Sequence, residues 1–154
     1  MMTGDDVQLV TFRVGRQEFA FDILQVERIL RYSAPSPLPN APGFLEGVLP
    51  YGDGTVPVID LRKRFELEAA IREETRLMVL ELEGQRIAVL VDEVVEVLRV
   101  KSISISAPSP FVSGLAAVYI SGIVTRGGRP LIILNARKLL SSSERLSLSE
   151  LGAA

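Results

Sequence analysis

The chain contains no cysteine and no histidine among its 154 residues. Their absence excludes disulfides, thiolate or imidazole metal ligands, Ser-His-Asp or Cys-His catalytic sites, and any phosphohistidine relay. No other side chain has an unperturbed pKa near neutrality, so sensing of pH near 7 is not built in. We therefore expect a protein without a cofactor or a bound metal.

Excess charge and long apolar runs are also lacking. Seventeen Lys and Arg oppose nineteen Asp and Glu, and the net charge of -2 gives no field that would attract nucleic acid. No run approaches the roughly 20 apolar residues of a membrane span. Residues 1–6 are acidic and lack the apolar segment of a signal peptide. The sequence therefore predicts neither nucleic-acid binding nor direct membrane insertion.

What the chain does contain is an internal repeat. Residues 10–31 align without a gap on residues 78–99, an offset of 68, and residues 44–65 align on 119–140, an offset of 75. Matching order, spacing and apolar face in two blocks indicate two copies of one small fold, and a pseudo-symmetric cleft between them. The paired positions include Phe12/Leu80, Phe21/Val89, Val26/Val94, Ile29/Val97, Gly47/Gly122, Gly52/Gly127, Asp60/Asn135 and Arg62/Arg137.

Alternating apolar residues in short runs predict the strands. Residues 7–14 and 18–23 form one hairpin across Gly15, and residues 79–83 and 86–91 repeat it across Gly84. A second hairpin spans 44–60 around Gly52, and its copy spans 118–134. Residues 23–30 are expected to form a short turn that continues into a strand. The proline-rich segment 33–43 predicts a stiff connector. Short strands with glycine turns at regular spacing favour closed barrels.

Short helices should begin near Asp60 and Asn135, whose side chains are good N-caps. Residues 141–154 could form a weak terminal helix or a frayed tail. We expect a single domain over 1–154, with lobe one at about 7–68, lobe two at about 75–141, and tails at 1–6 and 142–154. Each lobe alone is small for an independent core, so the lobes should share an apolar face.

Several stretches, in this order and spacing, resemble the CheW family of chemotaxis coupling proteins. They are residues 19–26, 38–48, 56–62, 80–86, 91–94, 120–123 and 131–135. The resemblance covers essentially 7–141. It implies an all-β fold of two pseudo-repeated, five-stranded SH3-like barrels with short helices and a shared apolar interface. It also implies a non-enzymatic adaptor, cytoplasmic in a bacterium or archaeon and recruited to membrane receptor arrays. Its expected partners are the chemoreceptor cytoplasmic tip and the regulatory domain of a chemotaxis histidine kinase.

Two surfaces follow from the repeat and the resemblance. The groove between the lobes should bind the receptor tip, as a helix lies in an apolar groove. The kinase should meet one lobe end-on by strand-edge pairing between like barrels. The alternative reading of the apolar groove residues is ordinary core, and the alternative reading of the two glycines is a bend in a curved strand. We expect the groove to contain Val26, Ile29, Leu49, Tyr51, Gly52, Val97 and Ile103, and the kinase surface to contain Gly47, Val48, Gly122 and Ile123.

One departure from the family is prominent. The family usually carries an Asn-Leu-Arg-Gly turn where this chain has Pro50-Tyr51-Gly52-Asp53, so Gly52 replaces the arginine presented to the receptor. A guanidinium supplies five donors, whereas glycine offers only backbone. Either the receptor contact is made differently, or the chain is a divergent scaffold that binds the kinase or another assembly without standard receptor binding.

A third reading is a carboxylate-based hydrolase on a small barrel. It would need two convergent acids in a pocket, and no Asp-x-Asp-x-Asp pattern or similar cluster supports it. Asp60 is expected to be an N-cap, and Arg62 and Lys63 are expected to be solvated surface on the first turn of their helix.

Overall fold

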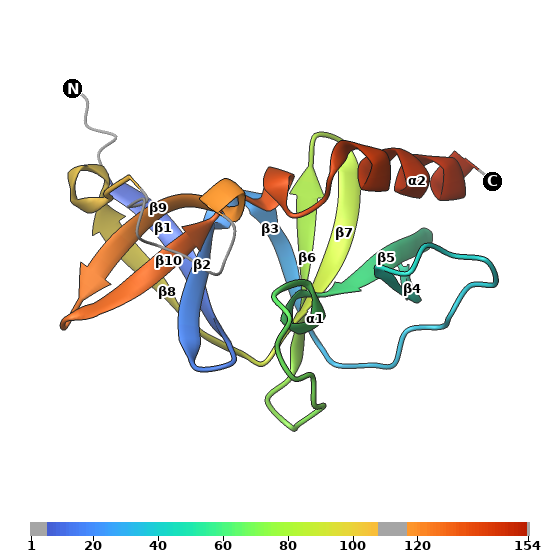
Figure 1. Cartoon of the computed structure of the whole chain (residues 1–154), viewed down its shortest axis with the longest axis horizontal. Coiled ribbons are helices and arrows are strands. Elements are labelled where there is room, and N and C mark those ends of the chain that lie inside the picture. The colour runs from blue at the N-terminus through green and yellow to red at the C-terminus, as the bar shows by residue number, and fades with distance from the viewer. Residues whose placement is uncertain (1–5, 108–116, 154) are drawn as a thin grey trace.

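The structure is a computed structural model, and it describes residues 6–107 and 117–153. Two five-stranded sheets stand side by side with short helices between and beside them (Figure 1). The fold is all-β, as expected. The strands are β1 (Asp6–Val14), β2 (Gln17–Asp22), β3 (Val26–Arg31), β4 (Leu45–Tyr51), β5 (Gly54–Asp60), β6 (Arg76–Leu82), β7 (Gln85–Val91), β8 (Glu93–Lys101), β9 (Ile120–Arg126) and β10 (Arg129–Leu134). The helices are η1 (Ile23–Gln25), α1 (Leu61–Arg64), η2 (Ser102–Ser104), η3 (Ala117–Tyr119), η4 (Ala136–Lys138) and α2 (Ser142–Ala153).

The two halves of the chain exchange strands. Sheet 1 has the order β8-β1-β2-β10-β9, and sheet 2 has the order β3-β6-β7-β5-β4. The first hairpin of each repeat is therefore the centre of one sheet, and the remaining strands of that repeat complete the other sheet. The expected lobes at 7–68 and 75–141 are repeats of sequence, but they are not the two sheets. The expected boundaries are wrong because pairing between distant strands is not visible in local patterns.

The repeat extends to the irregularities of the ladders. The pairing of β3 with β6 shifts between Val26 and Arg28, and the pairing of β8 with β1 shifts at the equivalent place, between Val94 and Glu96. A β-bulge of this kind bends a strand and increases its twist. Both sheets are thus curled in the same way at the same position.

Each curled sheet is closed by one short bridge. Ser36, which follows β3, exchanges two backbone hydrogen bonds of 2.9 Å with Val48 on β4. Ser106, which follows β8, exchanges bonds of 2.8 and 2.9 Å with Ile123 on β9. The chain leaving one edge strand therefore bonds to the opposite edge strand, which completes the two barrels.

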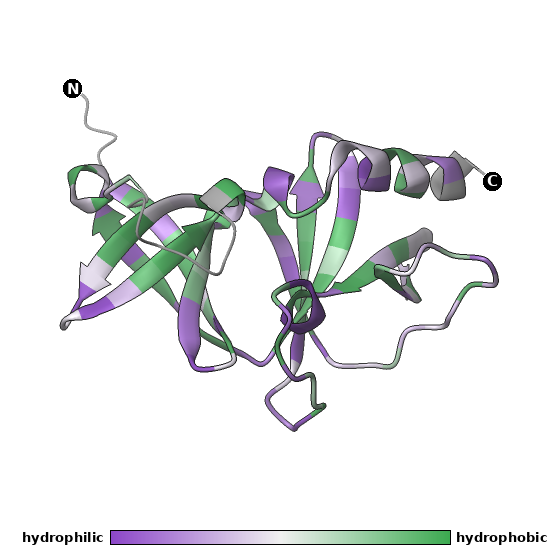
Figure 2. Cartoon of the chain, viewed as in Figure 1, coloured by the Kyte–Doolittle hydropathy of each residue, from purple (hydrophilic) through white to green (hydrophobic). Residues whose placement is uncertain are grey.

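The largest apolar cluster lies between the barrels. Phe12 and Phe21 of sheet 1 and Met78 and Val89 of sheet 2 belong to it, and each is buried. The ring centroids of Phe12 and Phe21 are 5.0 Å apart. Two smaller clusters fill the barrel interiors. Apolar positions recur along the strands of both sheets (Figure 2). The expected shared apolar interface is confirmed.

The local expectations for the connecting segments also hold. Asp60 accepts a hydrogen bond from the Arg62 amide, and Asn135 accepts one from the Arg137 amide, so both residues cap as predicted. Residues 23–25 form η1 and lead directly into β3.

The C-terminal segment is a helix and not a frayed tail. Helix α2 runs along the outside of sheet 2 (Figure 1). Leu148 is buried in the shared cluster, and Glu144 pairs with Arg64 at 3.0 Å. Of the two alternatives for residues 141–154, the terminal helix is confirmed and the frayed tail is wrong. The buried Leu148 and the ion pairs of Glu144 with Arg64 and of Arg145 with Glu83 dock the helix. The expected N-terminal tail lies outside the described residues except for Asp6, which begins β1.

Candidate interaction surfaces

Two exposed apolar side chains occupy equivalent places on the edge strands β3 and β8. Ile29 is 42% exposed and Val97 is 53% exposed. Ile29 is paired with Met78, and Val97 is paired with Val10. Directly opposed residues of an antiparallel pair point to the same face of the sheet. Since Met78 and Val10 belong to the shared core, both exposed side chains extend that core to the surface. We call Ile29 and Val97 the seam pair.

The other residues expected in the groove lie in several different environments. Val26 is partly buried and packs against the shared core. Leu49 is buried inside the sheet 2 barrel with Val56 and Val58, so its assignment to a surface groove is wrong. Ile103 lies in η2 beyond β8 and is strongly exposed. The structure thus places Val26 beside the seam, Leu49 in a core, and Ile103 on a separate short helix.

Tyr51 and Gly52 lie at the mouth of the sheet 2 barrel. The Tyr51 hydroxyl hydrogen-bonds Glu27, Arg86 donates to the same carboxylate at 2.8 Å, and the Arg28 guanidinium stands 6.0 Å from the Tyr51 ring centroid. The hydrogen bond from Tyr51, followed by that from Arg86, lowers the pKa of Glu27, because both favour its charged form. The half-buried Tyr51 therefore connects the two edge strands of sheet 2.

Gly52 is a turn residue with a left-handed backbone. Its φ is +57°, and that of the equivalent Gly127 is +55°. A Cβ atom at Gly52 would meet nothing within 4 Å. The turn therefore favours glycine through its backbone conformation, while the space around it is open.

The four residues expected at the kinase surface belong to the barrel closures. The backbone edges at Val48 and Ile123 are already bonded to Ser36 and Ser106, so the expected strand-edge pairing there is not available. A Cβ on Gly47 would lie 2.4 Å from the Ser36 carbonyl oxygen. A Cβ on Gly122 would lie 2.5 Å from Ile105 Cγ2. The alternative reading, a structural role in the strand, fits both glycines, through backbone contact and a φ of +147° at Gly47 and through side-chain contact at Gly122.

A buried ionic network around Arg62 was not predicted from the sequence. The Arg62 side chain is 1% exposed and donates to Asp60 at 2.8 and 3.0 Å, to Asp92 at 3.0 Å, and to the Ala70 carbonyl at 2.6 Å. Asp92 also accepts from the Gly15 amide at 2.7 Å. The bond to Asp60, and after it the bond to Asp92, raises the pKa of Arg62 despite burial.

The network corrects the expectation of a solvated Arg62, whereas Lys63 is exposed as predicted. One signal in the sequence could have indicated it. Arg137 is the equivalent of Arg62 in the second repeat. The positions equivalent to Asp60 and Asp92 are Asn135 and Leu24, so Arg62 has two acidic partner positions and Arg137 has none. The two carboxylates converge on a guanidinium that both of them bind.

Within residues 6–107 and 117–153, no group of three or more Asp or Glu side chains is arranged to hold a metal ion. None of the helices described there is long and apolar enough to cross a membrane.

The architecture defines a class of small two-barrel β proteins built from one repeated unit, with an apolar seam between the barrels. The chain belongs to the CheW-like domain family, whose model matches residues 8–144. It is 32% identical to a chemotaxis protein CheW of Treponema pallidum, over 97% of this chain and 91% of that protein. It is 33% identical to a chemotaxis protein CheW of Klebsiella aerogenes, over 93% of this chain and 88% of that protein. The crystal structure of the scaffolding protein TtCheW from Thermoanaerobacter tengcongensis superposes with a TM-score of 0.81 at 27% identity, covering 90% of each chain.

Proposed function

We propose that the protein is a non-enzymatic adaptor that couples the cytoplasmic tips of chemoreceptors to the regulatory domain of a chemotaxis histidine kinase. Membership of the CheW-like family supports this role, as does similarity to proteins named chemotaxis protein CheW and to a scaffolding protein of known structure. The adaptor works in the cytoplasm, where receptor arrays recruit it.

The observation that carries the receptor half of the proposal is the seam pair. Large apolar side chains at equivalent positions on two edge strands extend a buried core to the surface. A receptor helix that places an apolar stripe over Ile29 and Val97 would bury both. Val26, on the same strand as Ile29, is partly buried against the same core.

For the kinase half, we propose contact through side chains at the barrel closures. Val48 and Ile123 are half-buried and equivalent in the two barrels, and their backbones are already paired. The kinase barrel would therefore pack on these side chains and would not add a strand beside them. Gly47 and Gly122 leave room for the chain that closes each barrel beside these side chains.

A second candidate function is a scaffold that binds the kinase or another assembly without standard receptor binding. The exposed turn at Gly52 favours it, because no side chain stands where the family presents arginine. Only the first candidate requires receptor binding, so a receptor-binding measurement separates the two.

The test measures binding of a purified receptor-tip fragment and of a kinase regulatory domain by titration calorimetry. Ile29→Asp and Val97→Asp should each weaken receptor binding by roughly tenfold to a hundredfold, as expected for a buried apolar contact of about 1.4–2.8 kcal/mol. Leu146→Asp is the matched control, since Leu146 is also exposed but lies on α2. Kinase binding without receptor binding by the unmodified chain would favour the second candidate. Receptor binding unaffected by either seam variant would refute the seam assignment.

A further inference from the structure

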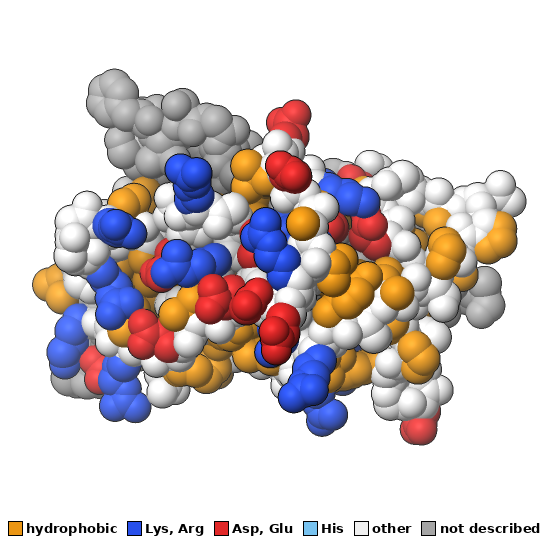
Figure 3. Space-filling view, turned by 90° about the horizontal axis from the view of Figure 1, so that it is seen from below, with side chains coloured by type: hydrophobic (Ala, Val, Ile, Leu, Met, Phe, Trp, Pro, Cys, Tyr) orange, Lys and Arg blue, Asp and Glu red, His pale blue; other side chains and the backbone are white. Residues whose placement is uncertain are grey.

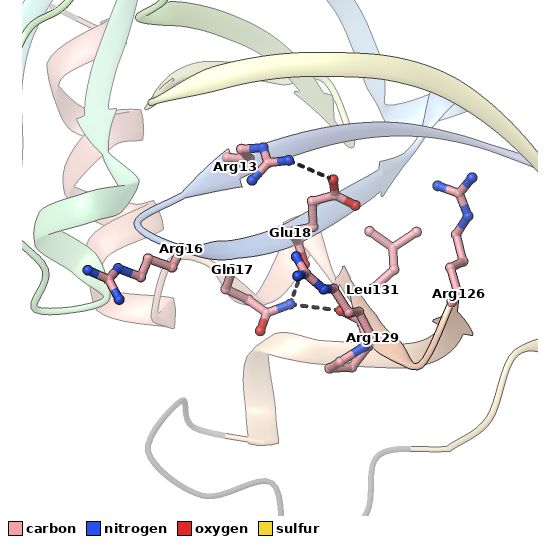
Figure 4. Close-up of a pocket in the computed structure, with 9 residues that line it drawn as sticks. Arg13, Arg16, Gln17, Glu18, Arg126, Arg129 and Leu131 are labelled. Carbon is pink, nitrogen blue, oxygen red and sulfur yellow. Dashed lines mark hydrogen bonds and ion pairs between the residues drawn. The ribbon is translucent and has the colours of Figure 1, made fainter.

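The mouth of the sheet 1 barrel is a hollow lined by arginines. The hollow has a volume of about 580 Å³ and lies between the β1–β2 turn and the β9–β10 turn. Its floor is the buried Leu131. We call it the basic mouth. Four guanidinium groups surround it, from Arg13, Arg16, Arg126 and Arg129 (Figure 4).

The other barrel shows that the fold does not require these arginines. At the equivalent positions sheet 2 has Tyr51 for Arg126, Gly54 for Arg129, and Gly84 for Arg16. A hollow occurs there too, but the Tyr51–Glu27–Arg86 network lines it and α2 borders it through Leu148 and Ser149. The same turns thus form with or without arginine, so building the barrel does not account for the presence of these arginines.

The charges of the basic mouth are only loosely satisfied. Arg13 lies 3.5 Å from Glu18 and 3.9 Å from Glu93, and Arg126 lies 3.3 Å from Glu96. These side chains are substantially exposed, so the pairs hold them weakly. Arg16 and Arg129 make no ion pair within the described part of the chain. Over the half of the molecule that contains sheet 1, Lys and Arg side chains lie interspersed with Asp and Glu side chains (Figure 3).

The arrangement of the guanidinium groups indicates the chemistry of the ligand. In Figure 4, Arg129 reaches toward Glu18, Arg126 stands on the opposite side, and Arg16 extends away from both. Groups that diverge in this way do not converge on a single phosphate. They suit carboxylates spaced along a peptide, since each guanidinium is a planar fork that matches one carboxylate. Glu18 already shows one carboxylate seated in the hollow beside Arg13.

We infer that the basic mouth binds an acidic segment of a partner protein, whose Glu or Asp side chains engage Arg126 and Arg129. This surface is built from turns at one barrel end and uses neither residue of the seam pair. The inference therefore does not depend on which proteins the seam binds.

The test is a titration of the full chain with a hexaglutamate peptide, followed by amide NMR shifts. Shifts should gather at residues 13–18 and 126–131, and raising the salt concentration should weaken binding. Arg126→Gln/Arg129→Gln should raise the dissociation constant at least tenfold. Arg137→Gln/Lys138→Gln is the matched control, because it removes two exposed positive charges of η4 and leaves the same net charge. The control should leave the dissociation constant within about twofold of the unmodified value.

A second variant guards against a folding defect. Arg126→Tyr/Arg129→Gly copies the residues that sheet 2 carries at the same turn, so it should fold and still lose hexaglutamate binding. Equal weakening by the mouth and control variants would overturn the inference, because binding would then reflect net charge. Competition by millimolar inorganic phosphate at constant ionic strength would also overturn it in favour of a phosphate site. Equal shifts with hexaglutamine would show that carboxylates are not recognised.

Discussion

Arg62 and Arg137 occupy the same place in the two repeats, yet Arg62 is buried and the Arg137 side chain is 60% exposed. The difference lies in their partners. Arg62 meets Asp60 and Asp92, whereas Arg137 has a capping Asn135 and a single pair with Glu83 at 3.5 Å. A buried guanidinium is tolerated only when carboxylates and carbonyls satisfy it. The two carboxylates therefore determine that Arg62 is buried.

Replacing Arg62 by leucine should destabilise the protein strongly. It leaves Asp60 and Asp92 without their cation in a largely buried site, and breaking such a pair costs about 3–5 kcal/mol. Arg137→Leu is the matched control at the equivalent position, and exposed substitutions of this kind change stability by about 0.5 kcal/mol or less. Urea unfolding followed by circular dichroism measures both. Similar midpoints for the two variants would show that the network is dispensable.

Gly52→Arg restores the side chain that the family usually carries at this turn. The φ of +57° makes any side chain there unfavourable by about 1–2 kcal/mol, although nothing obstructs it. We therefore expect a lower melting temperature. Gly127→Arg, at φ +55° in the other barrel, should cost about the same and serves as control. Receptor-tip binding measured in parallel decides the functional question, since tighter binding by Gly52→Arg alone would identify position 52 as a receptor-binding position that glycine leaves unused.

At the scale of elements, the barrel closures explain two glycines that recur in the repeat. Gly47 and Gly122 lie where the chain crosses over the edge strands β4 and β9. The obstacles differ in kind. Backbone of Ser36 fills the space at Gly47, which also has a φ of +147°, whereas a side-chain methyl of Ile105 fills most of the space at Gly122. The two glycines are equivalent in sequence but unequal in how a substitution could be accommodated.

Ile105→Ala should therefore rescue a substitution at one glycine only. Gly122→Ala alone should weaken the Ser106–Ile123 bridge and speed hydrogen exchange at those amides. In the Gly122→Ala/Ile105→Ala variant the obstructing methyl is gone, so the destabilisation should be less than additive. For Gly47→Ala no second substitution can remove the obstacle, because it is the Ser36 carbonyl. Hydrogen exchange at the Ser36 and Val48 amides should therefore be faster than in the unmodified protein, and a second substitution should not restore it. Additive destabilisation in the first pair would contradict this account of Gly122.

At the scale of the whole molecule, the exchange of hairpins makes the two halves depend on each other. Every sheet contains strands from both repeats, and the largest core cluster lies between the sheets. Helix α2 adds to this core through Leu148. Neither half of the chain contains a complete barrel, although each half contains a complete repeat.

Separate expression of residues 1–70 and 71–154 should therefore give no folded monomer. Each fragment lacks strands of both sheets and would expose the shared apolar face. Mixing the two fragments should restore β structure, because together they supply every strand. Circular dichroism and light scattering of each fragment and of the mixture measure this. A folded monomeric fragment would show that the lobes are independent after all.

The sequence by itself determined the features that depend on neighbouring residues. Alternation with a period of two located the hairpins, Gly15, Gly52 and Gly84 located turns, and Asp60 and Asn135 marked the caps. The repeat and the order of the motifs were sufficient to indicate the CheW family, which the match over residues 8–144 confirms.

Tertiary structure decided what depends on contacts between distant residues. Local patterns cannot show which hairpin enters which sheet, because both hairpins carry the same alternation. The burial of Arg62 required Asp92, thirty positions away along the chain. Leu49 and Ile29 are both apolar residues of strands in one sheet, yet Leu49 points into a barrel and Ile29 reaches the surface. Their different positions follow from the curl and closure of the sheet, which place one side chain inside the barrel and leave the other at the seam.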